Sequence, residues 1–132
     1  MVTDPIADML NRLRNATARQ FSTTQVPTSR FKEAVAELLV RQGWLEKYEL
    51  IKPGDKPAYL LLTLKYYEGQ PIMRGVTRIS KSGQRIYMNQ AKLAKHLSNK
   101  SETVVVSTSK GLMSGTEARA AQLGGEVLFK IW

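Results

Sequence analysis

Residues 104–125 read VVVSTSKGLMSGTEARAAQLGG, and this stretch decides the fold of the C-terminal half. It begins as an apolar strand and ends as a short helix. Between the two lies Ser107-Thr108-Ser109-Lys110-Gly111, a cluster of three hydroxyls, one ammonium and one glycine. Groups of these types hold an anion, activate a nucleophile or form a turn, so the rest of the sequence must distinguish three interpretations.

The segments on either side of this stretch make the C-terminal half rich in strands. Ser114 and Glu117 have the spacing of a capping box, which predicts a helix that runs to about Leu123. Residues 90–100 fit a short basic helix or an irregular loop. The strands expected here are residues 74–80 and 84–89, which form a hairpin about Lys81-Ser82-Gly83, and residues 102–107 and 126–132.

The first helix of the N-terminal half has a clear start. Thr3 or Asp4 can cap it, and Pro5 suits its first position. Apolar residues recur at helical spacing and form one buried stripe; they are Ile6, Met9, Leu10, Leu13 and Ala16.

A second helix and three strands complete the N-terminal half. Thr28 or Ser29 caps this helix, and Gly43 ends it. Its expected core face is Phe31, Ala34, Val35, Leu38 and Leu39. The strands are residues 23–27, 44–51 and 58–67.

These segments predict an α+β fold made of two small α/β domains. Residues 1–67 form an N-terminal domain in the order helix, strand, helix, strand, strand. Residues 68–71 form a linker. Residues 72–132 form a mostly β C-terminal domain with one short helix.

The composition excludes several classes of protein. The chain has no cysteine and one histidine, His96, so thiol chemistry and a histidine metal cluster are excluded, and an intracellular location is expected. We expect no metal and no cofactor. No apolar run is long enough to span a membrane, and the acidic residues Asp4 and Asp8 do not suit a signal peptide.

The charge points to a polyanionic partner. The formal net charge is +9. Seven basic residues and no acidic one lie between Glu68 and Glu102; they are Arg74, Arg78, Lys81, Arg85, Lys92, Lys95 and Lys100. Because a solvated surface normally mixes both signs, this stretch favours a phosphate-facing surface over plain solubility.

Two catalytic interpretations of residues 107–111 fail. Ser107 and Lys110 fit the S-x-x-K motif of penicillin-binding proteins, but the accompanying motifs occur in the reverse order and the chain is too short for such a site. A phosphate-binding loop needs glycines that this cluster lacks. We therefore expect that the protein is not an enzyme.

Contact with RNA is the better interpretation of the cluster. Serine and threonine hydroxyls bond phosphates and 2′-hydroxyls, lysine neutralises a phosphate, and glycine permits close approach. Arg85 and Tyr87 would share one face of a strand. The alternatives are a turn whose hydroxyls satisfy only local backbone groups, and a basic module that binds a membrane surface or a protein. The second needs an amphipathic helix, and residues 90–100 are its only candidate.

Four strings in the chain resemble the bacterial-type family of small-subunit ribosomal protein eight. They are DPIADMLNRLRNA (4–16), VPTSRFKEAVAELL (26–39), RISKSGQRIY (78–87) and STSKGLMSGTEARAAQLGGEVLFKIW (107–132). The resemblance implies a structural constituent of a bacterial-type ribosome, cytoplasmic or organellar, that binds the central domain of small-subunit ribosomal RNA and helps to assemble the platform. It implies neighbours from the families numbered five, twelve and seventeen. In some members it implies repression of the protein's own operon messenger RNA.

The resemblance also implies the residues that contact RNA. In the C-terminal domain they are Ser107, Thr108, Ser109, Lys110, Gly111, Lys81, Ser82, Arg85, Tyr87 and Glu126. In the N-terminal domain they are Thr3, Asp4, Pro5, Arg12, Asn15, Arg30 and Lys32. Ser82 stands where many relatives have proline and Gln84 where they have a basic residue, so we expect weaker contact at this turn.

Overall fold

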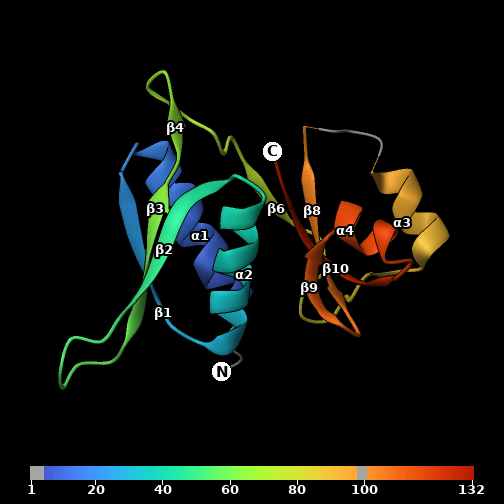
Figure 1. Ribbon diagram of the computed structural model, residues 1–132, viewed down its shortest axis with the longest axis horizontal. Coiled ribbons are helices and arrows are strands. Elements are labelled where there is room, and N and C mark those ends of the chain that lie inside the picture. Colours follow the sequence, from blue (N-terminus) through green and yellow to red (C-terminus); the bar gives the residue numbers. More distant parts are fainter. Residues whose placement is uncertain (1–4, 98–100) are drawn as a thin grey trace. The chain divides into compact units, whose positions relative to one another are not determined.

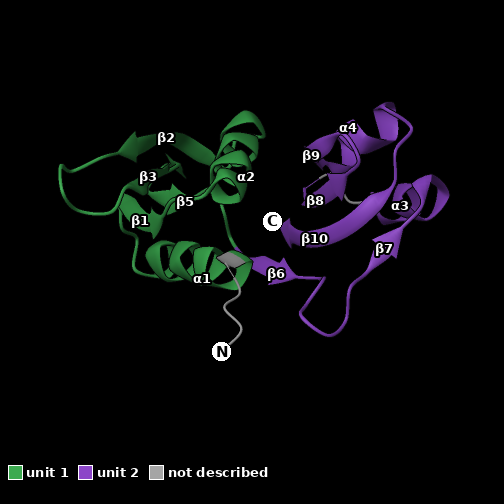
Figure 2. Ribbon diagram, turned by 90° about the horizontal axis from the view of Figure 1, so that it is seen from below, with its two compact units in different colours: residues 1–74 green, residues 75–132 purple. Residues whose placement is uncertain are grey.

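The computed structural model describes residues 5–97 and 101–132 and divides the chain into two compact units, Met1–Arg74 and Gly75–Trp132 (Figures 1 and 2). Both units combine helices with antiparallel sheets, so the predicted α+β class is confirmed. No helix in the described ranges is long and apolar enough to cross a membrane. The expected cap at Thr3 or Asp4 lies outside the described residues.

A three-stranded antiparallel sheet forms the frame of unit 1. Its order is β1 (Thr23–Pro27), β3 (Tyr59–Leu64), β2 (Leu45–Ile51), so β3 is central. Leu60 and Leu62 of β3 are fully buried, and Val26 of β1 is the direct partner of Leu60. This alternation of buried and half-buried residues along β3 gives the sheet one apolar face.

Two helices bury that apolar face. α1 (Pro5–Ala18) lies against β1, and α2 (Arg30–Arg41) lies against β2. The predicted stripe of α1 is buried at Met9, Leu10, Leu13 and Ala16, while Ile6 is half-buried. Ser29 caps α2 by accepting a hydrogen bond from the Lys32 N–H at 3.1 Å. Order and type of these elements agree with the predicted helix, strand, helix, strand, strand.

The core face of α2 is rotated slightly from the expected one. Val35, Leu38 and Leu39 are buried as expected, but Phe31 and Ala34 are only half-buried. Ala36 is fully buried instead. The buried face of α2 therefore keeps Val35, Leu38 and Leu39 and extends to Ala36 in place of Phe31 and Ala34.

Residues 68–71, expected as a linker, are part of unit 1. Residues 66–67 form β4 (Tyr66–Tyr67) and pair with β5 (Gln70–Pro71) in a short hairpin. Glu68 and Gly69 form its turn with φ angles of 51° and 79°. Because the hairpin supplies local hydrogen bonds, the division between the compact units falls later, after Arg74.

β10 (Gly125–Ile131) is the central strand of unit 2. β8 (Thr103–Thr108) pairs with one edge of β10. β6 (Val76–Arg78) and β7 (Tyr87–Met88) pair with the other edge in succession, β6 at residues 129–131 and β7 at residues 125–126. The expected pairing of residues 74–80 with residues 84–89 in a hairpin is therefore wrong, because β6 and β7 both pair with β10. The two segments meet near the turn, at the bridge between Lys81 and Gln84 and at the hydrogen bonds between Ser80 and Ile86.

The chain enters a further strand after residues 107–110 and not the helix directly. β9 (Gly111–Ser114) pairs back onto β8, and α4 (Gly115–Ala120) follows it. The capping box is confirmed, because the Ser114 hydroxyl accepts from the Glu117 N–H and the Glu117 carboxylate accepts from the Ser114 N–H. α4 ends three residues before the expected Leu123, since Gln122 adopts a φ of 59°.

Two helices, where one was expected, cover one face of this sheet. Asn89 caps α3 (Gln90–His96) by accepting from the Lys92 N–H at 2.8 Å. α3 and α4 contribute Leu93 and Ala118 to a cluster with strand residues that point to the same side. The other buried members of this cluster are Met88, Val104, Val106 and Val127.

Candidate nucleic-acid interface

Three of the expected RNA-contacting residues form one row across unit 2. Glu126 of β10 is the direct partner of Tyr87 in β7 and of Ser107 in β8. Directly opposed residues of an antiparallel sheet share a face. Their chain neighbours Met88, Val127 and Val106 belong to the buried cluster, so the row of Tyr87, Glu126 and Ser107 faces away from that core.

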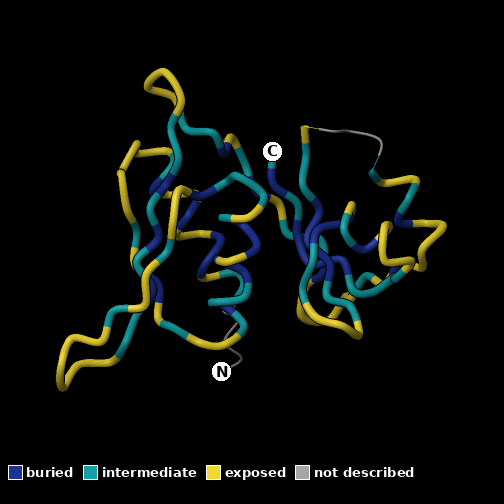
Figure 3. Tube along the Cα trace, in the orientation of Figure 1, coloured by how far each residue is buried: buried dark blue, intermediate teal, exposed yellow. Residues whose placement is uncertain are grey.

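The three side chains of the row differ in chemistry and in their exposure to solvent. Tyr87 is 66% exposed. Ser107 and Glu126 are half-buried. Figure 3 shows that the buried stretches of the chain lie in the helices and strands, whereas its loops and turns are largely exposed. An exposed aromatic ring beside a carboxylate and a hydroxyl offers a stacking surface and two hydrogen-bonding groups.

Two glycines allow the strands of the row to approach closely. A Cβ on Gly125 would lie 2.2 Å from the main-chain oxygen of Ser107. A Cβ on Gly124 would lie 2.4 Å from that of Met88. Side chains at these two positions would push β7 and β8 away from β10, so the row depends on Gly124-Gly125.

An ion pair restrains the carboxylate of the row. The Arg85 guanidinium Nη1 lies 3.3 Å from Oε2 of Glu126. Half of the Arg85 side chain is exposed, whereas the Glu126 side chain is 18% exposed. The arginine therefore restrains the carboxylate and offsets its negative charge, and the exposed Lys81 and Lys110 add positive charge to this unit.

Ser80 holds the loop that carries Lys81, Ser82 and Arg85. Its buried hydroxyl accepts from the Ile86 N–H at 2.9 Å and lies 3.3 Å from the Ile86 main-chain oxygen. This bond closes the loop at its base and replaces the expected ladder of a hairpin. Ser80 was missed as a site-shaping residue, because nothing in the sequence distinguishes it from any other loop serine.

A tight β-hairpin turn carries the cluster at residues 107–111. Ser109 and Lys110 are its two exposed turn residues, between Thr108 and its partner Gly111. The Thr108 hydroxyl donates to the Gly111 main-chain oxygen at 2.8 Å and accepts from the Lys110 N–H at 3.1 Å. Gly111 has a φ of 110°, which side chains disfavour. Thr108 therefore shapes the turn that presents Ser109 and Lys110.

The candidates in unit 1 are placed on its two helices. Arg12 and Asn15 are exposed on α1. Arg12 is also a structural residue: its Nη1 donates to the Gln25 main-chain oxygen of the edge strand β1 at 2.8 Å, and its Nε lies 3.2 Å from an Asp8 carboxylate oxygen.

The two basic candidates at the start of α2 differ in their exposure to solvent. Arg30 is exposed, but Lys32 is only 8% exposed. Lys32 therefore offers RNA far less surface than the sequence suggests. Thr3 and Asp4 lie outside the described residues, and Pro5 is described only as the first residue of α1.

A family model matches nearly the whole chain. The family model described as "Ribosomal protein S8" matches residues 4–132. The chain belongs to the ribosomal protein S8 family. The site residues of unit 2 therefore lie within the matched region of a ribosomal protein family.

Within the described ranges, no group of three or more histidine, cysteine, aspartate or glutamate residues is placed to hold a metal ion.

Curated relatives of this family cover the whole chain. The Dictyoglomus turgidum protein named small ribosomal subunit protein uS8 is 42% identical over 132 residues, which is 99% of this chain and 98% of the relative. The uS8 protein of Nitratidesulfovibrio vulgaris strain Miyazaki F is 39% identical over the full length of both chains. That of Halorhodospira halophila is 43% identical over 127 residues, 96% of this chain and 95% of the relative.

Proposed function

We propose that the protein is a structural constituent of the small ribosomal subunit that binds the central domain of its ribosomal RNA directly. The observation that carries this proposal is the row of Tyr87, Glu126 and Ser107 beside the hairpin turn at Ser109-Lys110. Segments far apart in the sequence meet there and present a ring, hydroxyls and cations on one strand-rich surface. The names of the relatives support the ribosomal setting.

Binding would have a general electrostatic part. Exposed basic residues displace counterions from RNA phosphates, which makes affinity depend on salt. Lys81, Arg85 and Lys110 supply this charge in unit 2, and Arg12 and Arg30 supply it in unit 1. This part does not distinguish one RNA helix from another.

Specificity would come from the row and the turn. The exposed Tyr87 ring stacks on an unpaired base, while the Ser107 and Ser109 hydroxyls bond base edges and 2′-hydroxyls. The Glu126 carboxylate, fixed by Arg85, accepts from a base amino group or a 2′-hydroxyl. These contacts need an irregular RNA helix whose bases are accessible in a wide minor groove.

The biological setting follows from this binding mode. We propose that the protein binds early, helps to assemble the platform in the cytoplasmic ribosome, and lies near the proteins of the families numbered five, twelve and seventeen. An operon messenger RNA that folds into the same irregular helix would compete for the same surface, which is the physical requirement for translational repression.

A basic membrane-surface module is the weaker alternative. α3 has seven residues, and its apolar Leu93 is fully buried in the core. The exposed residues of α3 are then too polar to enter a bilayer. Co-sedimentation with anionic liposomes tests this alternative, and we expect only weak, salt-sensitive association.

Reconstitution tests the assembly role. Small subunits are assembled from ribosomal RNA and purified proteins with and without this chain, and the protein content of the particles is measured. We expect that its omission depletes platform proteins and that adding it back restores them. Particles with unchanged composition would contradict the assembly role.

A further inference from the structure

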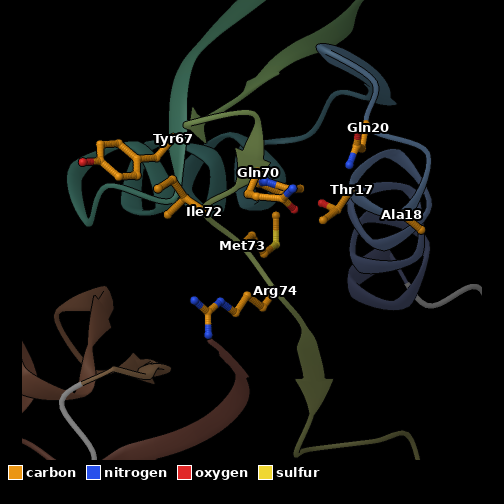
Figure 4. Close-up of a pocket in the computed structure, with 9 residues that line it drawn as sticks. Thr17, Ala18, Gln20, Tyr67, Gln70, Ile72, Met73 and Arg74 are labelled. Atoms are coloured by element: carbon orange, nitrogen blue, oxygen red, sulfur yellow. The ribbon is translucent and has the colours of Figure 1, made fainter.

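Unit 1 contains a pocket that the proposed RNA contacts do not use (Figure 4). Its volume is about 610 Å³, and all of its lining residues lie within unit 1. One wall is the end of α1 and the turn after it, with Thr17, Ala18 and Gln20. The other wall is the β4–β5 hairpin and the residues that follow it. This volume is in the range of sites that accept a side chain with part of its main chain.

The polar groups of the pocket suit a polypeptide main chain. Figure 4 shows Thr17 and Gln20 on the α1 side, and Gln70, from β5 of the hairpin, between them and Tyr67. Each glutamine amide offers a donor and an acceptor, which match the N–H and C=O of an extended segment. The Thr17 Oγ1 is buried and has no hydrogen-bond partner among the described residues, so this wall of the pocket is polar beneath its surface.

The apolar groups suit a hydrophobic anchor. Ile72 and the buried Met73 lie in the pocket wall, with Pro71 before them. Tyr67 lies beside Ile72 and is 67% exposed. Aromatic residues and methionine are enriched at the centres of protein–protein interfaces, where a side chain of one partner enters a pocket of the other.

The charge of the lining distinguishes a protein from RNA as the occupant. Among the described residues that line the pocket, Arg74 is the one charged residue, and none is a lysine or an acidic residue. RNA-binding surfaces are strongly positive, whereas protein interfaces are enriched in arginine and tyrosine and depleted in lysine and glutamate. A single arginine at the end of an apolar pocket is complementary to one carboxylate.

A second exposed aromatic residue extends this surface. Phe21 follows Gln20 and is 50% exposed. The Tyr66 hydroxyl donates to the main-chain oxygen of Phe21 and ties it to the hairpin. Two of the four exposed large hydrophobic residues in the described part of the chain, Phe21 and Tyr67, are thus carried by the two walls of this pocket.

We propose that the pocket binds an extended segment of a neighbouring protein that carries an apolar side chain beside an aspartate or glutamate. The apolar side chain packs against Ile72 and Met73, the carboxylate pairs with Arg74, and the main chain bonds Gln20 and Gln70. The proposal rests on the proposed function in one respect: the neighbour is another protein of the small subunit.

Photo-cross-linking from two matched tyrosines tests this proposal. Tyr67→p-benzoylphenylalanine places the probe at the pocket, and Tyr87→p-benzoylphenylalanine places it on the row; the two tyrosines are 67% and 66% exposed. Each variant is the only copy of this chain in small subunits reconstituted from purified RNA and proteins. Urea unfolding of each free variant shows that it is folded, and RNA binding is used as a second check only for the Tyr67 variant, which leaves the row intact.

We expect position 67 to cross-link to a polypeptide in which an apolar residue adjoins an acidic one, and position 87 to cross-link to RNA. Adding Ala18→Trp fills the pocket and should lower the cross-link at position 67 at least tenfold. Ala91→Trp, at an equally exposed helix position outside the pocket, should leave it unchanged.

The proposal is overturned if position 67 cross-links to RNA or to nothing, or if Ala18→Trp does not reduce its protein cross-link. If position 87 gives no cross-link to RNA, the proposed RNA contact is overturned instead. The two failures are therefore distinguishable in the same particles.

Discussion

Glu126 and Ser107 are direct partners across β10 and β8, on the side of the sheet that faces away from the buried cluster. Tyr87 is the partner of Glu126 on its other edge. This pairing converts three residues from separate parts of the chain into one continuous surface. It also makes the surface depend on backbone spacing, which can be changed independently of the contacting side chains.

The Gly125→Ala change tests that dependence. The added Cβ would meet the Ser107 main-chain oxygen at 2.2 Å, so β8 and β10 must separate. We expect the free energy of unfolding to fall by about 2–3 kcal/mol, as in other overpacked sites, and RNA affinity to fall with it. Urea unfolding and RNA titration measure the two effects.

Gly54→Asn is the control, because Gly54 has a φ of 71° and open space around it, and asparagine tolerates this conformation. Equal stabilities for both variants would contradict the close approach.

The Lys110→Ala change tests the electrostatic part of binding. Lys110 is exposed at the hairpin turn. Removing its charge should weaken binding to every RNA and lower the slope of log affinity against log salt by about one. Titrations at four or more salt concentrations give the slope.

The control is Lys56→Ala, in the exposed loop between β2 and β3, which should leave the slope almost unchanged. A loss confined to cognate RNA would show that Lys110 reads the RNA and does not merely neutralise a phosphate.

Substitutions at Thr108 and Ser109 distinguish a residue that shapes the turn from a residue that contacts RNA directly. Thr108→Ala removes two local hydrogen bonds, whereas Thr108→Ser retains the hydroxyl. We expect Thr108→Ala and Ser109→Ala each to weaken cognate RNA binding by about 1–2 kcal/mol, with little effect on random duplex RNA. Thr108→Ser should restore most of the affinity. Faster amide exchange at Lys110 in Thr108→Ala alone would identify the turn as the cause; equal losses on both RNAs would refute a role in specificity.

The Ser114→Ala change tests a purely structural motif next to the site. Ser114 is 2% exposed and caps α4 through the Glu117 N–H. Losing this cap should lower the free energy of unfolding by about 1–2 kcal/mol. RNA affinity under native conditions should stay within twofold of the unmodified protein. Urea unfolding monitored by circular dichroism measures the first effect, and a large loss of RNA affinity with intact stability would contradict the assignment.

Local patterns predicted the helices of unit 1 and the caps of α2 and α4 well. Helical spacing identified the α1 stripe at Met9, Leu10 and Leu13, and Ser29 and Ser114 were expected caps. These features depend on residues three or four positions apart, so the sequence carries them directly. The capping box of α4 is the clearest case, because both of its hydrogen bonds are present.

Long-range pairing accounts for what the sequence did not show. Residues 74–80 and 84–89 resemble a hairpin, but their true partner, β10, begins about forty residues later. The four residues of β9 are too few to be told from a loop. The burial of Lys32 and the bond from Arg12 to Gln25 are tertiary features, so a basic residue in the sequence does not reveal whether it faces RNA.

The most direct test of the central claim is RNA binding by the purified protein over a range of salt concentrations. The ligands are a central-domain fragment of small-subunit ribosomal RNA and a random duplex of equal length. We predict tight binding to the fragment that persists at moderate salt while the random duplex is released. Equal, steeply salt-dependent binding to both RNAs would contradict the account, because the positive charge alone would then explain binding and the row of Tyr87, Glu126 and Ser107 would have no role in recognition.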